Sequence, residues 1–282
     1  MRWTDDRSGN VEDRRGLGGG AVVGGGLGTL IIAAIVFFLG GDPSAVLSGS
    51  GSGSPRTEQR QLNNDELKVR EFVEMVTAEN EQTWTKIFAE NGMKYEPAKV
   101  ILFENTTQSG CGTAQSAMGP FYCPADQSVY MDMSFFKELQ SQFGAKVTEF
   151  SIAYVMAHEM GHHVQTLLGT TQQVDEYRRS GRYSEAAMNR ISVATELQAD
   201  FYAGVWAKQT DAREHILEPG DIDAAISAAE AVGDDNIQKR SQGYVNQESF
   251  THGSSAQRKE WFMKGYETGD IRQGNTFDQL LK

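Results

Sequence analysis

Residues 17–41 form an uncharged segment, LGGGAVVGGGLGTLIIAAIVFFLGG, that ends in a dense aliphatic and aromatic run. A helix of this length can cross a bilayer hydrocarbon core of about 30 Å. A cleaved signal peptide and a buried core helix are the alternatives, but no clear small-residue cleavage site follows the run. The sequence therefore predicts one uncleaved transmembrane anchor, which divides the 282-residue chain into a short tail and a large domain.

The charges that flank this segment predict its orientation. Arginines within the first 15 residues precede it, whereas the next basic residue after it is Arg56. Because the more basic flank of a membrane segment stays in the cytoplasm, residues 1–16 are expected to be a flexible cytoplasmic tail. The domain after the anchor is then expected on the periplasmic or extracellular side of the cytoplasmic membrane.

The chain beyond the anchor begins with a Gly/Ser-rich linker, residues 42–62, and continues as a domain over residues 63–282. Helical spacing and capping residues predict a helix that starts near Asn63 and stops at an Asn-Gly pair. The other expected elements are β-rich runs at 98–105 and 128–135, and helices at 135–143, around 154–169, at 184–208, from 221 and from 254. Few strands followed by many helices indicate an α+β domain, mainly helical with a small sheet.

Charge and cysteine usage narrow the function classes. The net charge of −12 argues against nucleic acid as a partner, since such proteins need a basic surface. Cys111 and Cys123 lie in a loop rich in glycine and proline. A cysteine-ligated metal is the alternative, but a lone pair at this spacing is not a zinc signature. Outside the cytoplasm, the simplest expectation is a disulfide.

The stretch AHEMGH places two histidines four residues apart, His158 and His162, with Glu159 directly after the first. On a helix, positions four apart share one face, so both rings can bind one metal ion. Glu159 would lie beside the ion, where it can hold a water and take its proton. The alternative, a core helix with hydrogen-bonded histidines, would bury three polar groups that each need a partner. His163 points off this face and is expected to be a supporting or surface residue.

A catalytic zinc usually takes three protein ligands, so another residue must complete the site. His215, His252 and the acidic residues are the candidates. Glu196 and Asp200 stand out, because they lie four apart in the strongly apolar stretch ATELQADFYAGVWA, where unpartnered carboxylates are rare. We expect Glu196 to bind the metal and Asp200 to accept a hydrogen bond from a ligand histidine. The alternative, a solvated acidic stripe, fits the apolar neighbours poorly.

HExxH followed by Glu-x-x-x-Asp resembles the gluzincin zinc peptidases. Over nearly its full length the chain resembles the bacterial family of membrane-anchored neutral zinc metallopeptidases. The resemblance rests on the ordered set MRW, NVEDRRG, the glycine-rich anchor, GPFYCP, VYMD, AHEMGHHVQ, ELQADFYAGVWA and SFTHGSSAQRKEWFMKGYETGD. It implies a zincin-like fold, and by that fold SVYMDM (residues 128–133) would border the substrate cleft; a plain core strand is the alternative.

The segment FTHGSSAQR resembles an element of some integral-membrane gluzincins in which a histidine approaches the metal. His252 would then stabilise the oxyanion of the tetrahedral intermediate. Alternatively, His252 only precedes a helix and Arg258 forms a structural ion pair. Tyr202 and Tyr244 are further possible donors that the sequence does not distinguish from core aromatics.

These observations predict a membrane-anchored hydrolase that cleaves peptide bonds in proteins or peptides. One Zn²⁺ per chain is expected on His158, His162 and Glu196, with Glu159 as general base. A catalytically silent zinc-binding scaffold is the alternative, although Glu159 has no role in holding the ion and is present. A non-peptide amide, such as a cell-wall cross-link, would use the same chemistry and differ only in cleft shape.

Overall fold

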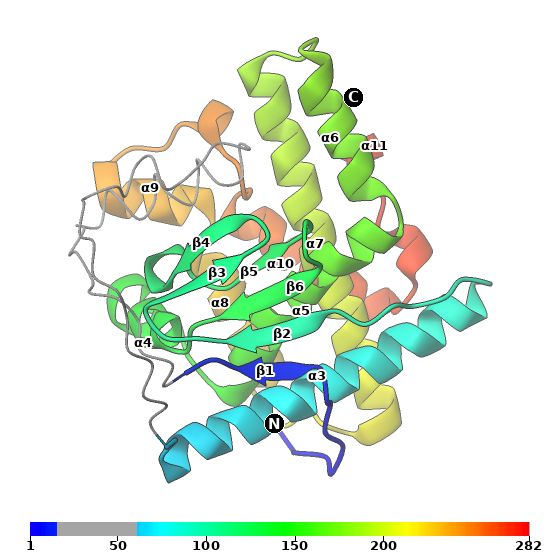
Figure 1. The fold of residues 1–282 in the computed structure, drawn as a ribbon. Helices are drawn as coiled ribbons and strands as arrows, with labels where there is room; N and C mark the ends of the chain where they lie inside the picture. The colour runs from blue at the N-terminus through cyan, green and yellow to red at the C-terminus, as the bar shows by residue number, and fades with distance from the viewer. Residues whose placement is uncertain (16–60, 282) are drawn as a thin grey trace.

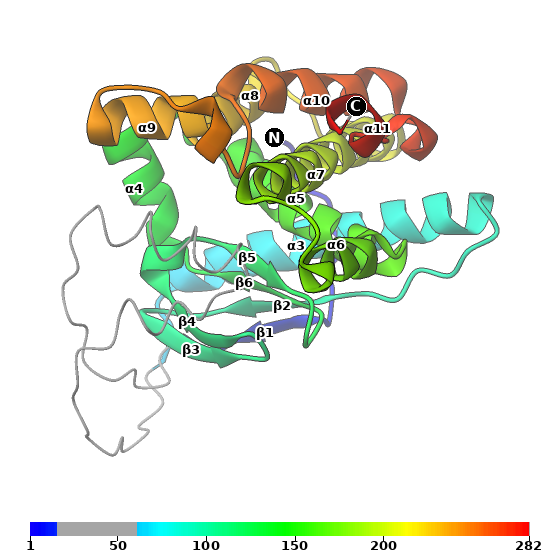
Figure 2. The same ribbon diagram turned by 90° about the horizontal axis from the view of Figure 1, so that it is seen from above.

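The computed structural model describes residues 1–15 and 61–281. The expected anchor at 17–41 and most of the expected linker lie outside these residues. None of the helices in the two described ranges combines the length and the apolar character that a membrane crossing requires. The fold is α+β: a small mixed sheet carries helices stacked on one face, and a β-hairpin lies over the other (Figure 1, Figure 2).

The main sheet has the strand order β1-β2-β6-β5. Its strands are β1 (Val11–Asp13), β2 (Lys99–Leu102), β6 (Ser128–Met131) and β5 (Phe121–Cys123). β1, β2 and β6 are parallel, whereas β5 runs antiparallel to β6 and forms one edge. Val100 and Val129 face the helices, and their neighbours Ile101 and Tyr130 pack against the hairpin. Burial on both faces explains why β2 and β6 read as continuous apolar runs.

A second, two-stranded sheet covers the face opposite the helices. It consists of β3 (Thr106–Ser109) and β4 (Gly112–Gln115), joined by a turn that carries Cys111. The predicted disulfide is present and links Cys111 to Cys123 at the end of β5. The segment expected as a loop between the two β-rich runs therefore contains β3, β4 and β5, and the disulfide ties the hairpin turn to the edge strand.

The helices form layers on the other face of the sheet. They are α3 (Asn64–Glu90), α4 (Ser134–Phe143), α5 (Glu149–Leu167), α6 (Thr170–Ser180), α7 (Glu185–Glu214), α8 (Asp221–Ala231), α9 (Asp234–Gln242), α10 (Ser255–Thr268) and α11 (Phe277–Leu280). α3 and α5 contact the sheet, α7 packs on α5, and α10 packs on α7 (Figure 2). The helix predicted from Asn63 is confirmed, with Asn63 closing a capping box; α6, α9 and α11 were not predicted.

The contact between α7 and α10 brings two backbones close together. A Cβ on Gly204 would lie 2.1 Å from the carbonyl oxygen of Phe262, and a Cβ on Gly265 would lie 2.0 Å from that of Phe201. Because no side chain fits at either crossing position, glycine at both lets α10 lie directly on α7. This contact brings the start of α10 beside the middle of α7.

Residues 1–15 belong to the folded domain, which corrects the expectation of a flexible tail. Val11 to Asp13 pair in parallel with Val100 to Leu102, so β1 covers the sheet edge opposite β5 (Figure 1). The segment before β1 follows α3, where the Thr4 hydroxyl donates to the buried Glu79. The sequence hid this role because the segment is polar and its contacts, such as that of Thr4, are made with residues far along the chain.

The β1–β2 pairing also bears on the expected membrane topology. A single crossing between residues 15 and 61 would put β1 and β2 on opposite sides of the bilayer, where they could not share hydrogen bonds. The arrangement with the N-terminus inside and the domain outside is therefore incompatible with this sheet. Whichever side the domain occupies, residues 1–15 share it.

Labelling of single cysteines in cells can check whether residues 1–15 and the domain lie on the same side of the membrane. Asp5 and Lys94 are exposed, and the chain has no free cysteine among its described residues. With Asp5→Cys and Lys94→Cys variants in a bacterial host, we expect a membrane-impermeant maleimide to give the same result at both positions. Inverted membrane vesicles should give the reciprocal result at both. Labelling of one position from each side would contradict the fold of residues 1–15.

Candidate metal centre and active site

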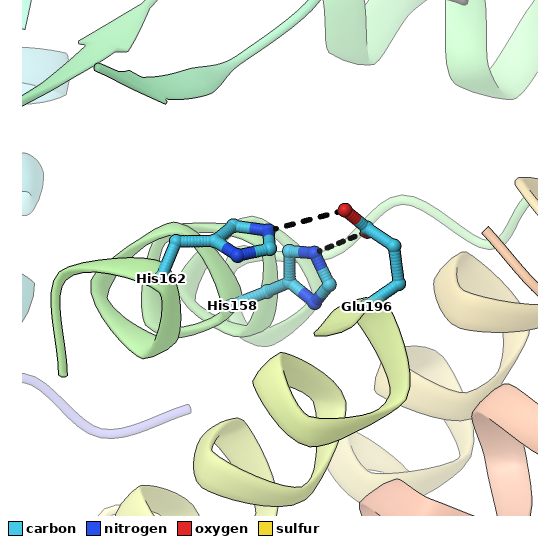
Figure 3. A group of neighbouring side chains, drawn as sticks. All are labelled: His158, His162 and Glu196. Atoms are coloured by element: carbon cyan, nitrogen blue, oxygen red, sulfur yellow. Dashed lines mark hydrogen bonds and ion pairs between the residues drawn. The ribbon is translucent and has the colours of Figure 1, made fainter. Parts of the chain in front are cut away.

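Helix α5 places its two histidines side by side. The His158 and His162 rings lie 4.9 Å apart between centroids and are nearly perpendicular. Both present Nε2 to Glu196 of α7, at 3.2 Å from Oε2 for His158 and 3.4 Å from Oε1 for His162 (Figure 3). One ligand atom from each residue lies within 4.8 Å of the other two. The structure thus brings together the three residues that the sequence suggested as metal ligands.

Gly161 explains how Glu196 comes so near. A Cβ at Gly161 would lie 3.0 Å from the carbonyl oxygen of Ala199 and 3.1 Å from its Cα. A side chain at this position would therefore push α5 and α7 apart. The glycine inside the HEMGH stretch is a packing residue that allows α5 and α7, which carry the candidate ligands, to cross closely.

The donor set fits a zinc ion. Two imidazole nitrogens and a carboxylate oxygen are a common catalytic zinc set, which leaves a fourth position open. Within the described residues, the buried His162 Nε2 has no hydrogen-bond partner. A buried ring nitrogen without a partner costs free energy, and a metal ion at the point where the three donors converge would satisfy it.

Asp200 lies at the centre of a hydrogen-bond network that orients His158. Its carboxylate is fully buried and lies 2.8 Å from His158 Nδ1. The Tyr154 hydroxyl donates to it at 2.6 Å, and Arg258 donates through Nε at 2.8 Å and Nη2 at 2.9 Å. Burial disfavours the charged form, but Arg258 outweighs it and holds the pKa of Asp200 at about 2. Asp200 therefore stays ionised and keeps His158 Nε2 directed at the metal position, as in carboxylate–histidine–zinc relays.

The same network sets the protonation of His158. Burial lowers the pKa of His158, but the carboxylates of Asp200 and Glu196 outweigh it and raise the pKa to about 10. Without a metal, His158 therefore carries a second ring proton, which the two carboxylates stabilise. A metal ion would displace that proton, because a ligand nitrogen must be deprotonated.

Glu159 lies beside the three converging side chains and is 6% exposed. Its Oε2 has no hydrogen-bond partner among the described residues. Burial raises the pKa of Glu159 to about 7, and although the nearby Glu196 adds to the rise, His158 and the Tyr122 backbone amide oppose it. A carboxylate with a pKa near neutrality can both take and return a proton.

His252 is held by Asp234 rather than by the metal group. Asp234 Oδ2 accepts the backbone N–H groups of Thr251, His252 and Gly253 at 2.7, 2.6 and 2.9 Å, and its Oδ1 lies 3.2 Å from His252 Nδ1. Burial lowers the pKa of His252, but Asp234 and Glu196 outweigh it and raise the pKa. His252 is thus a half-buried histidine whose pKa is raised in part by the charge of Glu196.

The remaining candidates take other places. His215 ends α7 at an exposed position. Tyr244 is 64% exposed, whereas Tyr202 packs edge-on against Trp84 in the core. Arg258 forms the structural ion pair that the sequence suggested, with Asp200.

His163 turns away from the metal group but is not a surface residue. It is fully buried; its Nε2 lies 2.6 Å from the carbonyl oxygen of Glu96, and its Nδ1 lies 3.1 Å from the Tyr122 hydroxyl. A carbonyl only accepts, so Nε2 carries the proton and Nδ1 accepts from Tyr122. His163 therefore ties α5 to strand β5.

SVYMDM was expected to border the substrate cleft, but it forms the inner strand β6. The strand at the sheet edge is β5. β6 pairs with β2 on one side and with β5 on the other, so its backbone is not open to a peptide. β5 ends the sheet on the side of α5, and its Tyr122 backbone amide lowers the pKa of Glu159. The sequence did not show that β6 is an inner strand, because its outer neighbour β5 is short and lies inside the segment expected as the cysteine-containing loop.

Three supporting residues escaped the sequence analysis. Tyr154 lies one turn before His158, and Gln165 lies one turn after His162, so helical periodicity already placed both on the ligand face. Gln165 accepts from His162 Nδ1 at 2.9 Å. Tyr122 carried no comparable signal, since its place depends on the fold of β5.

Comparisons with known proteins agree with this geometry. The family described as "Putative neutral zinc metallopeptidase" matches residues 1–277. The chain is 42% identical to the uncharacterized protein YpfJ of Escherichia coli K12, over the full length of both. It is 46% identical over 194 residues to the uncharacterized protein Rv2575 of Mycobacterium tuberculosis H37Rv, covering 65% of this chain and 63% of that protein. No solved structure matches.

The role of Glu196 can be checked by metal analysis. We expect Glu196→Gln to weaken zinc binding by about 100-fold or more, because the amide loses the charge that balances the cation. Elemental analysis after dialysis against a weak chelator measures the zinc content per chain. Glu185→Gln is the matched control, since Glu185 is exposed on the same helix. Equal zinc content in Glu196→Gln and the control would show that Glu196 is not a zinc ligand.

Proposed function

The chain belongs to the neutral zinc metallopeptidase family, and we propose that it hydrolyses peptide bonds in proteins or peptides with one Zn²⁺ on His158, His162 and Glu196. The observation that carries this proposal is a pair of buried atoms, His162 Nε2 and Glu159 Oε2, that find no hydrogen-bond partner in the described part of the chain. Both lie where a zinc peptidase needs a ligand and a base. A structural zinc site would use the first atom but has no use for the second.

Glu159 supplies the proton transfers. When bound, zinc would lower the pKa of a water and polarise the substrate carbonyl. Glu159 would accept a proton from the attacking water and return it to the leaving amine, so it would act first as base and then as acid. Its raised pKa in the metal-free site supports this role, and a cation beside it would favour the ionised, basic form.

His252 is the residue that we propose for the oxyanion. Asp234 accepts the His252 backbone N–H and lies beside its Nδ1, so the position of the ring is fixed. Its raised pKa, to which Glu196 contributes, supports a protonated donor near the metal group. A positioned donor of this kind is worth more in a buried site than in water.

Strand β5 is the surface that we propose for the substrate backbone. It is the edge strand next to α5, and an extended peptide can extend a sheet at such an edge by main-chain hydrogen bonds. The disulfide to Cys111 and the Tyr122–His163 hydrogen bond hold the two sides of this strand. Recognition through backbone atoms requires little side-chain specificity.

For localisation we propose a site of action outside the cytoplasm, at the membrane. The disulfide supports it, because such bonds persist in oxidising compartments. Membrane attachment through residues 17–41 stays a prediction from the sequence. The N-terminus, expected in the cytoplasm, is instead proposed on the same side as the domain, because β1 pairs with β2.

Glu159→Gln tests the proposed chemistry. We expect the zinc-loaded variant to cleave unfolded proteins and peptides at least about 100-fold more slowly than wild type, because the amide cannot accept the proton. Zinc content should be unchanged, as it should also be in the control Glu185→Gln. Equal cleavage by wild type and Glu159→Gln would exclude this mechanism. Wild-type protein that binds zinc and cleaves neither peptides nor cell-wall cross-links would be a scaffold.

His252→Gln tests the oxyanion role. We expect kcat to fall by about 100-fold with little change in KM, because the donor acts on charge that develops in the transition state. His215→Gln is the control, since His215 is exposed. If kcat is unchanged while the thermal stability falls, His252 only fixes the segment before α10.

A further inference from the structure

A chain of two glutamine side chains leads from His162 to the C-terminal segment. His162 Nδ1 lies 2.9 Å from Gln165 Oε1, and Gln165 Nε2 lies 3.1 Å from Gln198 Oε1. Gln198 Nε2 in turn lies 2.8 Å from the carbonyl oxygen of Gly274. Gln165 and Gln198 are 1% and 7% exposed, so solvent competes little for these hydrogen bonds.

Two backbone carbonyls fix the direction of this chain. Gln165 Nε2 also lies 2.7 Å from the carbonyl oxygen of Thr195, and a carbonyl oxygen only accepts hydrogen bonds. The amide nitrogens of Gln165 and Gln198 must therefore face Thr195 and Gly274. The Oε1 of Gln165 is then left to face His162, which makes His162 Nδ1 the donor.

A neutral imidazole carries one proton, so a proton on Nδ1 leaves the lone pair on Nε2. Nε2 is the His162 atom that faces Glu196 and has no hydrogen bond among the described residues. We propose that Gln165 and Gln198 are positioning residues that fix the Nδ1–H tautomer of His162 and hold its Nε2 toward the metal position. This proposal rests on the proposed function only in taking His162 as a metal ligand.

The far end of the chain is held firmly by the C-terminal segment. A Cβ on Gly274 would lie 2.6 Å from Cδ1 of Phe201, so only glycine lets this backbone lie on the ring. Two residues later, the buried Thr276 hydroxyl donates to the carbonyl of Ala194 on α7. The Gly274 carbonyl is thus a fixed acceptor, and the segment after α10 contributes to the site through it.

The choice of an amide next to His162 also has an electrostatic reason. His158 is oriented by the charged Asp200, whose charge Arg258 balances. A second carboxylate next to His162 would add a negative charge close to Glu159 and Glu196 with no cation to balance it. A neutral amide fixes the tautomer without adding that charge.

The test compares Gln165→Leu, Gln198→Leu and the double variant with wild type and with Gln172→Leu, an exposed glutamine on α6. For Gln165→Leu we expect a zinc Kd raised about 10- to 100-fold, as for other supporting residues of zinc sites, measured by competition with a chelator. Gln198→Leu should raise it less. The double variant should be no weaker than Gln165→Leu alone, because both residues act through one hydrogen bond to His162.

A second readout needs neither zinc nor activity. In metal-free protein with ¹⁵N-labelled histidine, wild-type His162 should be a single Nδ1–H tautomer, and Gln165→Leu should lose that preference. Unchanged tautomer and zinc affinity in a folded Gln165→Leu protein would overturn the proposal. If Gln165→Leu does not fold, the tautomer in Gln198→Leu decides in the same way. Wild-type protein that binds no zinc would refute the proposed function, while the tautomer would still decide the role of Gln165.

Discussion

The buried carboxylate of Asp200 connects the helices that build the site. It lies on α7 and receives hydrogen bonds from Tyr154 on α5 and from Arg258 on α10, besides its contact with His158. Removal of one partner from such a buried pair typically costs about 3 to 5 kcal/mol, because the other charge stays buried without compensation. The network therefore fixes how α5, α7 and α10 meet. Since the three candidate metal ligands lie on α5 and α7, their geometry depends on the same charge.

The sheet holds the other side of the site, and its two edges differ in what covers them. At one edge the outermost strand is β1, which comes from the start of the chain. At the other edge the outermost strand is β5, which lies next to Glu159. The disulfide fixes the hairpin turn to β5 at Cys123, and the Tyr122–His163 hydrogen bond joins β5 to α5. The edge strand is thus attached both to the hairpin and to α5, the helix that carries Glu159. This arrangement keeps a short strand in place without a second strand partner.

Local patterns predicted the parts of the fold and site that depend on neighbouring residues. The spacing of His158 and His162 and the isolated acids of α7 were visible because helical periodicity places side chains without knowledge of tertiary contacts. β1 and β5 were not visible in the sequence, because both are three-residue strands that exist only through pairing with distant segments. The segment before β1 resembled a solvated tail because the acceptors of its Thr4 and Ser8 hydroxyls, Glu79 and Glu81, lie far along the chain. Gln165 and Gln198 went unnoticed for the same reason: a neutral amide in a helix is ordinary until its partners are known.

The charges around the metal position explain why its two histidines are supported differently. Glu196, Glu159 and Asp200 are three buried acids, and Arg258 balances one of them. A divalent cation would balance the other two, so the site with zinc would be close to neutral and Glu159 could stay ionised at neutral pH. A further acid beside His162 would add a negative charge without a cation to balance it. That charge would raise the pKa of Glu159, so Glu159 would be protonated more often and could accept a proton less often. In the proposed site, the neutral pair Gln165 and Gln198 would orient His162 without adding charge near Glu159.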